Sequence, residues 1–188
     1  MSELASLSTY LKGCLKQYPN FPKEGILFED FLPIFSNPED FQKLIDAFVL
    51  HVKQQFPNQK IDYVVGLESR GFLFGPTLAL ALGAGFIPVR KPGKLPGKTH
   101  QVTFKKEYGE DTFEMQDSII KSGSTVLIVD DILATGGSAQ AAGELVLKNE
   151  GAKILEFLFV MELDFLKGRD KLQANTFTLL SGQTEKLQ

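Results

Sequence analysis

Short runs of mostly apolar residues alternate with segments of helical periodicity, and this alternation restricts the fold more than any other feature of the sequence. The apolar runs cover residues 61–67, 86–89, 125–129 and 154–160. Strands that are apolar at every position are buried on both faces, as in a parallel sheet. Helices that alternate with such strands cover the two faces of that sheet. Residues 1–188 are therefore predicted to form a single α/β domain, a central parallel sheet flanked by helices.

Two of the intervening segments carry clear local signals. Apolar residues recur on one helical face across 38–56, and Asn37 and Pro38 suit the cap and first turn of that helix. Residues 72–89 carry no charge, and their length alone would permit a membrane span. Glycine and proline residues interrupt this stretch, so it is predicted to be a buried helix followed by a buried strand, with no membrane association.

Composition excludes several classes of function. The formal net charge is −3, and no block of basic residues suggests a protein that binds nucleic acid through its phosphates. Cys14 is the one cysteine, so no intrachain disulfide can form, and a reducing compartment is expected. The first residues do not resemble a secretory signal. A cytoplasmic location is expected, with nuclear presence left open. His51 and His100 lie far apart in sequence and do not suggest a metal site.

The strongest motif is VLIVDDILATGGSA, residues 126–139. An apolar strand ends in Asp130 and Asp131, and a Thr-Gly-Gly-Ser turn then leads into a helix. Free backbone N–H groups at a helix start attract an anion, and glycines let the backbone approach a phosphate. Carboxylates suit ribose hydroxyls or Mg²⁺ beside that phosphate. The alternative is a capped helix preceded by two solvated acids. The GxGxxG and GxxxxGK motifs of dinucleotide and triphosphate sites are absent here.

Two further segments suit anion binding. In GLESRGFLFGP, residues 66–76, Arg70 follows a strand and precedes a helix start, although the same pattern fits an arginine on a solvated loop. Arg90 and Lys91 end the next strand, where a basic pair also fits a solvated edge. Residues 91–106 are polar, basic and interrupted by two Pro-Gly pairs, which predicts a long exposed loop that acts as a mobile lid. A hairpin around Tyr108 and Gly109 would end this loop.

These motifs together resemble the signature of the type I phosphoribosyltransferases. The resemblance implies the fold of that family, with a small N-terminal hood over residues 1–35. It implies that Asp130 and Asp131 hold the ribose hydroxyls of phosphoribosyl pyrophosphate. Its 5-phosphate would bind to Ala134, Thr135, Gly136, Gly137 and Ser138. Its diphosphate would bind to Glu68, Ser69, Arg70, Gly71, Arg90, Lys91 and Lys94. Mg²⁺ would be held mainly by substrate oxygens, with Asp130 and Asp131 contributing directly or through water.

The N-terminal segment FPKEGILFEDFLPI, residues 21–34, resembles the one that adenine-specific members of this family place over the base. The resemblance implies that the backbone at Leu27 and Glu29 reads the adenine edge and that the Phe28 ring stacks on it. As a bare pattern, such a phenylalanine is more often a core residue. Glu29 departs from members with a basic residue there, which matters if that contact uses the side chain. The segments RKPGKLPG, KEYG and MELDFLKGR extend the match over nearly the whole chain, most similar to fungal members.

The same resemblance implies a reaction. Adenine and phosphoribosyl pyrophosphate would give AMP and diphosphate, a salvage reaction, with Arg70 and Glu107 as catalytic residues and Tyr108 helping to close the lid. Glu107 alone also fits a solvated hairpin residue. A homodimer is implied, because diphosphate sites of this family borrow contacts from a neighbour. The alternatives are transfer to another purine base, an inactive paralogue, or a regulator that senses the ribose diphosphate.

Overall fold

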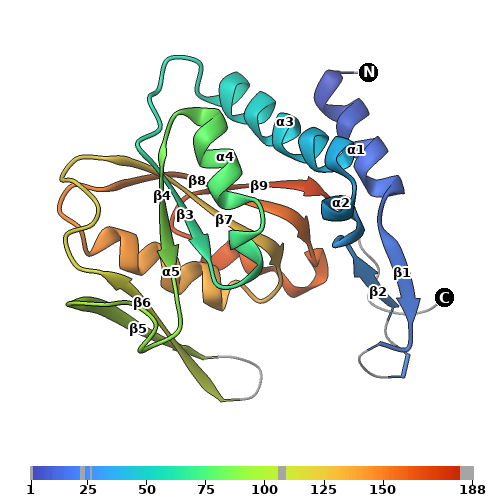
Figure 1. Ribbon diagram of the computed structural model, residues 1–188. Coiled ribbons are helices and arrows are strands. Elements are labelled where there is room, and N and C mark those ends of the chain that lie inside the picture. The colour runs from blue at the N-terminus through green and yellow to red at the C-terminus, as the bar shows by residue number, and fades with distance from the viewer. Residues whose placement is uncertain (1, 22–23, 26, 106–108, 183–188) are drawn as a thin grey trace.

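The chain folds around a five-stranded sheet in which all neighbouring strands are parallel (Figure 1). The computed structural model describes residues 2–21, 24–25, 27–105 and 109–182. The strand order is β4-β3-β7-β8-β9. The strands are β3 (Tyr63–Leu67), β4 (Gly85–Val89), β7 (Thr125–Leu133), β8 (Lys153–Glu162) and β9 (Asn175–Leu180). The predicted α/β fold with a central parallel sheet is confirmed.

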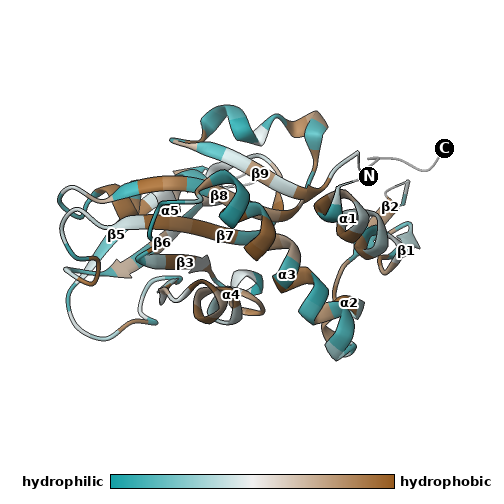
Figure 2. Ribbon diagram, turned by 90° about the horizontal axis from the view of Figure 1, so that it is seen from above, coloured by the Kyte–Doolittle hydropathy of each residue, from teal (hydrophilic) through white to brown (hydrophobic). Residues whose placement is uncertain are grey.

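Helices and a hairpin cover the two faces of this sheet. The helices are α1 (Glu3–Gly13), α2 (Pro33–Ser36), α3 (Pro38–Gln55), α4 (Gly75–Leu82) and α5 (Gly137–Leu147), with short 3-10 helices at Arg70–Phe72, Asp164–Leu166 and Gly168–Lys171. The first four helices pack on one face, and α5 packs on the other together with strands β5 (Thr99–Lys105) and β6 (Glu110–Gln116). In Figure 2 the hydrophobic strand β7 runs between these layers. Both faces are buried, which explains why the central strands are mostly apolar.

Local sequence signals account for most of the element boundaries. The helix predicted over 38–56 is α3, and Asn37 Oδ1 accepts hydrogen bonds from the backbone of Glu39 and Asp40 at 2.9 and 3.4 Å. The uncharged stretch 72–89 contains α4 and β4. Within the described part of the chain, no helix is both long and apolar enough to cross a membrane. Strand β9 has no counterpart among the predicted elements, because its first residues are asparagine and threonine.

The segment 91–106 is not a continuous loop, so this part of the prediction is wrong. Residues 99–105 form β5, which pairs antiparallel with β6 as the predicted hairpin requires. Val102 faces Phe113 in this pairing, and the Thr103 and Thr112 hydroxyls lie 2.9 Å apart. These cross-strand contacts stabilise extended backbone despite the many polar residues. Tyr108 lies outside the described residues, so the turn itself is not described.

The N-terminal residues predicted as a hood form a substructure outside the main sheet. Helix α1 packs against α3, and β1 (Lys16–Pro19) pairs antiparallel with β2 (Leu27–Asp30). Tyr18 lies opposite Phe28 in this small sheet. Figure 1 shows both strands extending away from the central sheet, on the side toward which the central strands point. Whether this unit covers a bound base remains a prediction.

Candidate active site

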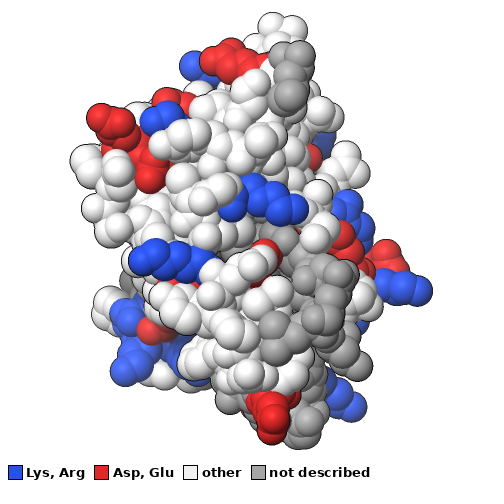
Figure 3. All heavy atoms as spheres, turned by 90° about the vertical axis from the view of Figure 1, so that its right-hand side faces the viewer, with Lys and Arg blue, Asp and Glu red and all other residues white. Residues whose placement is uncertain are grey.

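A pocket of about 540 Å³ lies where β3, β4 and β7 end. Residues 68–70, Lys91 and residues 130–139 line it. The loops predicted to converge after three different strands therefore meet at one place, as expected for a parallel sheet. On the face shown in Figure 3, the described Lys and Arg side chains lie in separate groups among acidic and uncharged ones. The described basic side chains on this face therefore form no continuous patch.

The two acids lie in the second half of β7. The strand continues through Asp130 and Asp131 to Leu133, so both carboxylates are held by the sheet. Asp131 is 4% exposed, and its Oδ2 lies 2.9 Å from Arg70 Nη1. The geometry of this ion pair is not that of a hydrogen bond, and Asp131 Oδ2 accepts none from the described residues. Burial raises the pKa of Asp131, and Arg70 offsets this in part. Burial and the charge of Asp131 raise the pKa of Asp130 well above its ordinary value.

The predicted phosphate loop lies directly at the start of α5. Gly136 has φ +81°, a left-handed conformation that glycine adopts freely, and no side chain caps the helix. Gln140 N–H donates to the Gly136 carbonyl at 2.9 Å as the first helical bond, so the preceding N–H groups of the turn remain available for an anion. A Cβ on Gly136 would collide with the Gly168 carbonyl. The glycine is therefore required by the backbone conformation and by the close approach of residue 168.

The residues predicted to bind diphosphate divide into two groups. Glu68, Ser69, Arg70 and Lys91 line the pocket, and the Glu68–Ser69 peptide is cis. Gly71, Arg90 and Lys94 do not line it. A Cβ on Gly71 would lie 2.8 Å from the Val129 carbonyl oxygen, so this glycine permits close packing of the loop on β7.

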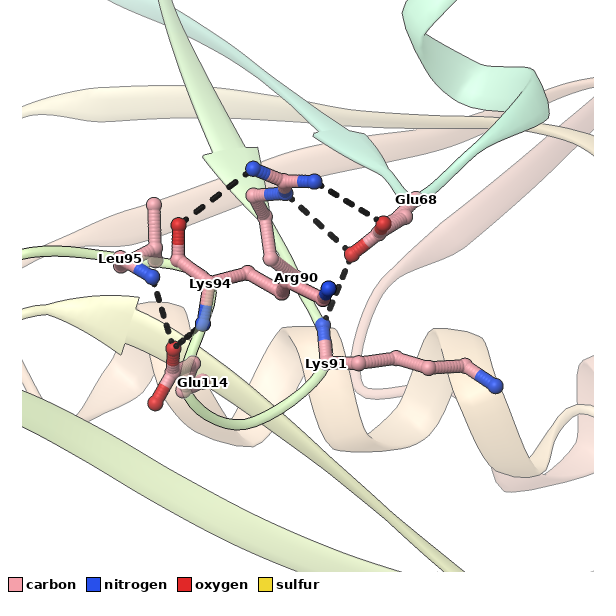
Figure 4. A network of polar contacts seen from close by, with 6 residues as sticks. All are labelled: Glu68, Arg90, Lys91, Lys94, Leu95 and Glu114. Atoms are coloured by element: carbon pink, nitrogen blue, oxygen red, sulfur yellow. Dashed lines mark hydrogen bonds and ion pairs between the residues drawn. The ribbon is translucent and has the colours of Figure 1, made fainter.

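The Arg90 side chain binds other protein groups and does not line the pocket (Figure 4). Its Nη2 donates to Glu68 Oε1 at 3.0 Å, its Nε to Glu68 Oε2 at 3.3 Å, and its Nη1 to the Lys94 carbonyl at 3.3 Å. Lys91 N–H also donates to Glu68 Oε2, at 2.9 Å. Arg90 and Lys91 hold the pKa of Glu68 below its ordinary value. Direct contact of Arg90 and Lys94 with diphosphate stays a prediction.

The structure does not bring the predicted base-reading segment into the pocket. Leu27, Phe28 and Glu29 lie on β2, and the Phe28 ring packs edge-on against Phe21 with 5.1 Å between centroids. Glu29 Oε1 accepts a hydrogen bond from Gln17 Nε2 at 3.0 Å. The adenine contacts of this segment therefore remain untested. Glu107 and Tyr108 lie outside the described residues, so the structure gives no position for either.

Four pocket residues were missed by the sequence motifs. Asp111 and Phe113 come from β6, and Phe159 and Leu163 come from β8 and the residue that follows it. Ligands of parallel sheets bind beyond the carboxyl ends of the strands, and this rule applied to the run 154–160 would have indicated Phe159 and Leu163. No local pattern marks the hairpin residues. The carboxylate of Asp111 enters through tertiary packing and lies 3.7 Å from Lys91 Nζ.

The acids are compatible with a magnesium ion that the protein holds in part. Among the described residues, no three His, Cys, Asp or Glu side chains are grouped to bind a metal. The two adjacent carboxylates nevertheless include a buried oxygen without an aligned donor, Asp131 Oδ2. Mg²⁺ characteristically binds one or two carboxylates and takes its other ligands from phosphates and water. The donor set therefore fits an ion whose remaining ligands belong to the substrate.

Comparison with known proteins agrees with this geometry. The family model for the phosphoribosyl transferase domain matches residues 34–183. The adenine phosphoribosyltransferase of Eremothecium gossypii is 71% identical over 94% of each chain. The crystal structure of the Saccharomyces cerevisiae adenine phosphoribosyltransferase, complexed with D-2,5-dideoxy-2,5-imino-altritol 1,6-bisphosphate and adenine, is 69% identical and has a TM-score of 0.90, over 94% of this chain and 99% of that one.

A more distant structure retains the fold. The adenine phosphoribosyl transferase of Trypanosoma brucei, in complex with AMP, pyrophosphate and ribose-5-phosphate, is 28% identical with a TM-score of 0.82, over 96% of this chain and 82% of that one. The predicted similarity to fungal members is confirmed by the first two comparisons. The family match covers most of the chain and includes the acids of β7 and the turn before α5. This chain belongs to the phosphoribosyltransferase family.

Proposed function

We propose that this protein is an adenine phosphoribosyltransferase, which converts adenine and phosphoribosyl pyrophosphate into AMP and diphosphate. The observation that carries the proposal is the pairing of Asp130 and Asp131 with the open start of α5 in one pocket. The identity of the base is supported by the 71% and 69% identical adenine phosphoribosyltransferases of fungi.

Three groups of pocket residues suit the three parts of phosphoribosyl pyrophosphate. The N–H groups of the turn before α5 face where a 5-phosphate would bind, because a helix start attracts an anion. Asp130 and Asp131 provide acceptors for the ribose hydroxyls beside it. Arg70, which lies beside Asp131, and Lys91 provide positive charge in the same pocket for the diphosphate.

In the reaction, the bond from the anomeric carbon to the diphosphate oxygen breaks, and its electrons leave with the diphosphate. The lone pair of an adenine ring nitrogen forms the new bond to that carbon, and the proton on this nitrogen must be removed. The protein contributes position and fixed charge, since Arg70 and Lys91 compensate the negative charge that grows on the leaving group. We propose that Glu107 manages the proton, as the family resemblance implies.

Asp130 and Asp131 are the residues that would contact Mg²⁺, directly or through water. When bound, the ion would compensate charge on the diphosphate. The raised pKa of each acid in the protein alone reflects burial without a full set of partners. A cation and ribose hydroxyls would provide those partners, and both acids would then be ionised in the complex.

Several features remain proposals that rest on the family resemblance. The β1–β2 hood is proposed to place Leu27, Phe28 and Glu29 over adenine. Residues 91–106 are proposed to act as a lid over the pocket, which Tyr108 helps to close. We also propose a homodimer and a cytoplasmic location, the latter supported by the lack of disulfide-forming cysteines.

A base-comparison assay tests the proposed function. The purified protein is given phosphoribosyl pyrophosphate, Mg²⁺ and adenine, hypoxanthine, guanine or xanthine in turn. Adenine should be consumed rapidly and the oxo purines hardly at all, because mispaired polar groups in a binding site can cost about 10⁴-fold. Equal turnover of hypoxanthine or guanine would refute the base assignment. Binding of phosphoribosyl pyrophosphate without turnover of any base would instead indicate a sensing regulator.

A further inference from the structure

Glu114 is a buried acid outside the pocket that none of the site motifs includes. It lies on β6 and is 2% exposed. Its strand neighbours Phe113 and Met115 belong to the core on the α5 side of the sheet. Because side chains alternate along a strand, Glu114 points to the opposite side of the hairpin. Loop 91–98, which connects β4 to β5, lies over that side (Figure 4).

Both carboxylate oxygens of Glu114 accept hydrogen bonds from the segment that follows β4. Oε1 accepts from the backbone N–H groups of Lys94 and Leu95, each at 3.0 Å. Oε2 accepts from Thr99 Oγ1 and Gln101 Nε2, each at 3.2 Å. Burial raises the pKa of Glu114, but these bonds outweigh it and leave the pKa below its ordinary value. The side chain is therefore an ionised acceptor for loop 91–98.

This loop is connected in turn to the pocket. The backbones of Arg90 and Glu114 exchange hydrogen bonds of 3.0 and 2.7 Å. Arg90 also bridges the Lys94 carbonyl and the carboxylate of Glu68, which lines the pocket. Lys91 follows Arg90, and Figure 4 shows its side chain extending away from the network. Contacts thus run without a break from Glu114 through the loop to the pocket residues Glu68 and Lys91.

We propose that Glu114 is a positioning residue for the diphosphate end of the pocket. It fixes loop 91–98 and thereby holds Lys91 and Glu68 in place. The inference rests on the proposed function, because it assigns diphosphate to this end. Stability alone does not explain a glutamate at position 114, since apolar side chains often stabilise a buried position at least as well as charged ones. A carboxylate is needed where two adjacent backbone N–H groups must be held in one place.

The test compares Glu114→Gln and Glu114→Met with Glu110→Gln and Glu110→Met. Glu110 is exposed and lies on the same side of β6. Glutamine keeps one oxygen for the loop but removes the charge, whereas methionine removes both acceptors at similar size. We expect the Kd for phosphoribosyl pyrophosphate, measured by calorimetry, to rise about threefold for Glu114→Gln and about tenfold or more for Glu114→Met. In the Glu114 variants the KM for adenine should change less than twofold. In both Glu110 control variants the Kd for phosphoribosyl pyrophosphate should also change less than twofold.

Limited trypsin digestion gives a second, independent measurement. Trypsin cuts after Lys94, and the N–H of that peptide bond is the Leu95 N–H held by Glu114. Cutting at this bond should be faster in both Glu114 variants than in the wild type and the controls. An unchanged Kd in the folded Glu114 variants overturns the inference, even if they unfold at lower temperature. If Glu114→Met does not fold, an unchanged Kd and unchanged cutting in Glu114→Gln overturn it. An inactive wild type would refute the proposed function, while the Kd comparison would still test Glu114.

Discussion

Replacing both acids of β7 should separate substrate binding from stability. Asp130→Asn combined with Asp131→Asn keeps the shape of both side chains and removes two charged acceptors in the pocket. Hydrogen bonds to charged groups contribute roughly 1.5–3 kcal/mol each. Loss of one such bond at each acid should weaken binding of phosphoribosyl pyrophosphate by about 3–6 kcal/mol, or roughly 10²- to 10⁴-fold. Isothermal calorimetry with Mg²⁺ measures this directly.

The ligand-free protein should gain stability from the same change. Burial raises the pKa of both acids in the folded protein, and the charge of Asp131 raises that of Asp130 further. An acid with a raised folded pKa contributes stability below its unfolded pKa of about 3.9 and loses that contribution as pH rises through the folded pKa. Asparagine does not titrate, so the advantage of the double variant should grow over this pH range. Arg70 loses its partner but is 46% exposed, so the cost is small.

Chemical denaturation between pH 4 and pH 8 measures the second half of the prediction. The double variant should be more stable than the wild type by roughly 0.5–2 kcal/mol at pH 8, the common size of the gain from a stabilising substitution. Asp46→Asn, on the exposed side of α3, is the control. It should change neither the Kd for phosphoribosyl pyrophosphate nor the free energy of unfolding. An unchanged Kd for the double variant would refute the ribose assignment. A stability loss that grows with pH would refute the electrostatic argument.

Four further predictions concern other parts of the molecule. Gly136→Ala should cost at least about 1–2 kcal/mol of unfolding free energy, because φ +81° is unfavourable for alanine and the added Cβ would collide with the Gly168 carbonyl. It should also abolish tight phosphoribosyl pyrophosphate binding, and normal calorimetric binding would contradict this. Proteolysis within 91–106 should be suppressed by phosphoribosyl pyrophosphate with Mg²⁺, and equal cutting with and without them would exclude a lid. Phe28→Leu should weaken adenine binding by roughly 1–3 kcal/mol without changing base preference, and Glu29→Gln should have little effect, which competition assays measure. Light scattering should give a homodimer, and a fully active monomer of 20.8 kDa would refute this.

Signals that lie within a few consecutive residues were sufficient to predict the core of the fold and one side of the site. The apolar runs of β3, β7 and β8 indicated a parallel sheet, because burial on both faces favours apolar residues at most strand positions. Asp130 and Asp131 followed by two glycines indicated a phosphate-and-ribose site, because the strand end, the acids and the helix start are adjacent in the chain.

Contacts between distant segments were decided by the tertiary structure. Arg90 follows a strand and resembles an anion ligand in the sequence, yet it is bound to Glu68, 22 residues earlier. Glu114 has the pattern of a polar residue on a half-exposed strand, but loop 91–98 covers it, and the loop and β5 each give it two hydrogen-bond donors. Local sequence specifies which groups are available and how the backbone is disposed around them. Which of those groups reach a ligand and which bind each other depends on packing between segments, because a charged side chain is satisfied by whichever partner the fold brings within about 3 Å.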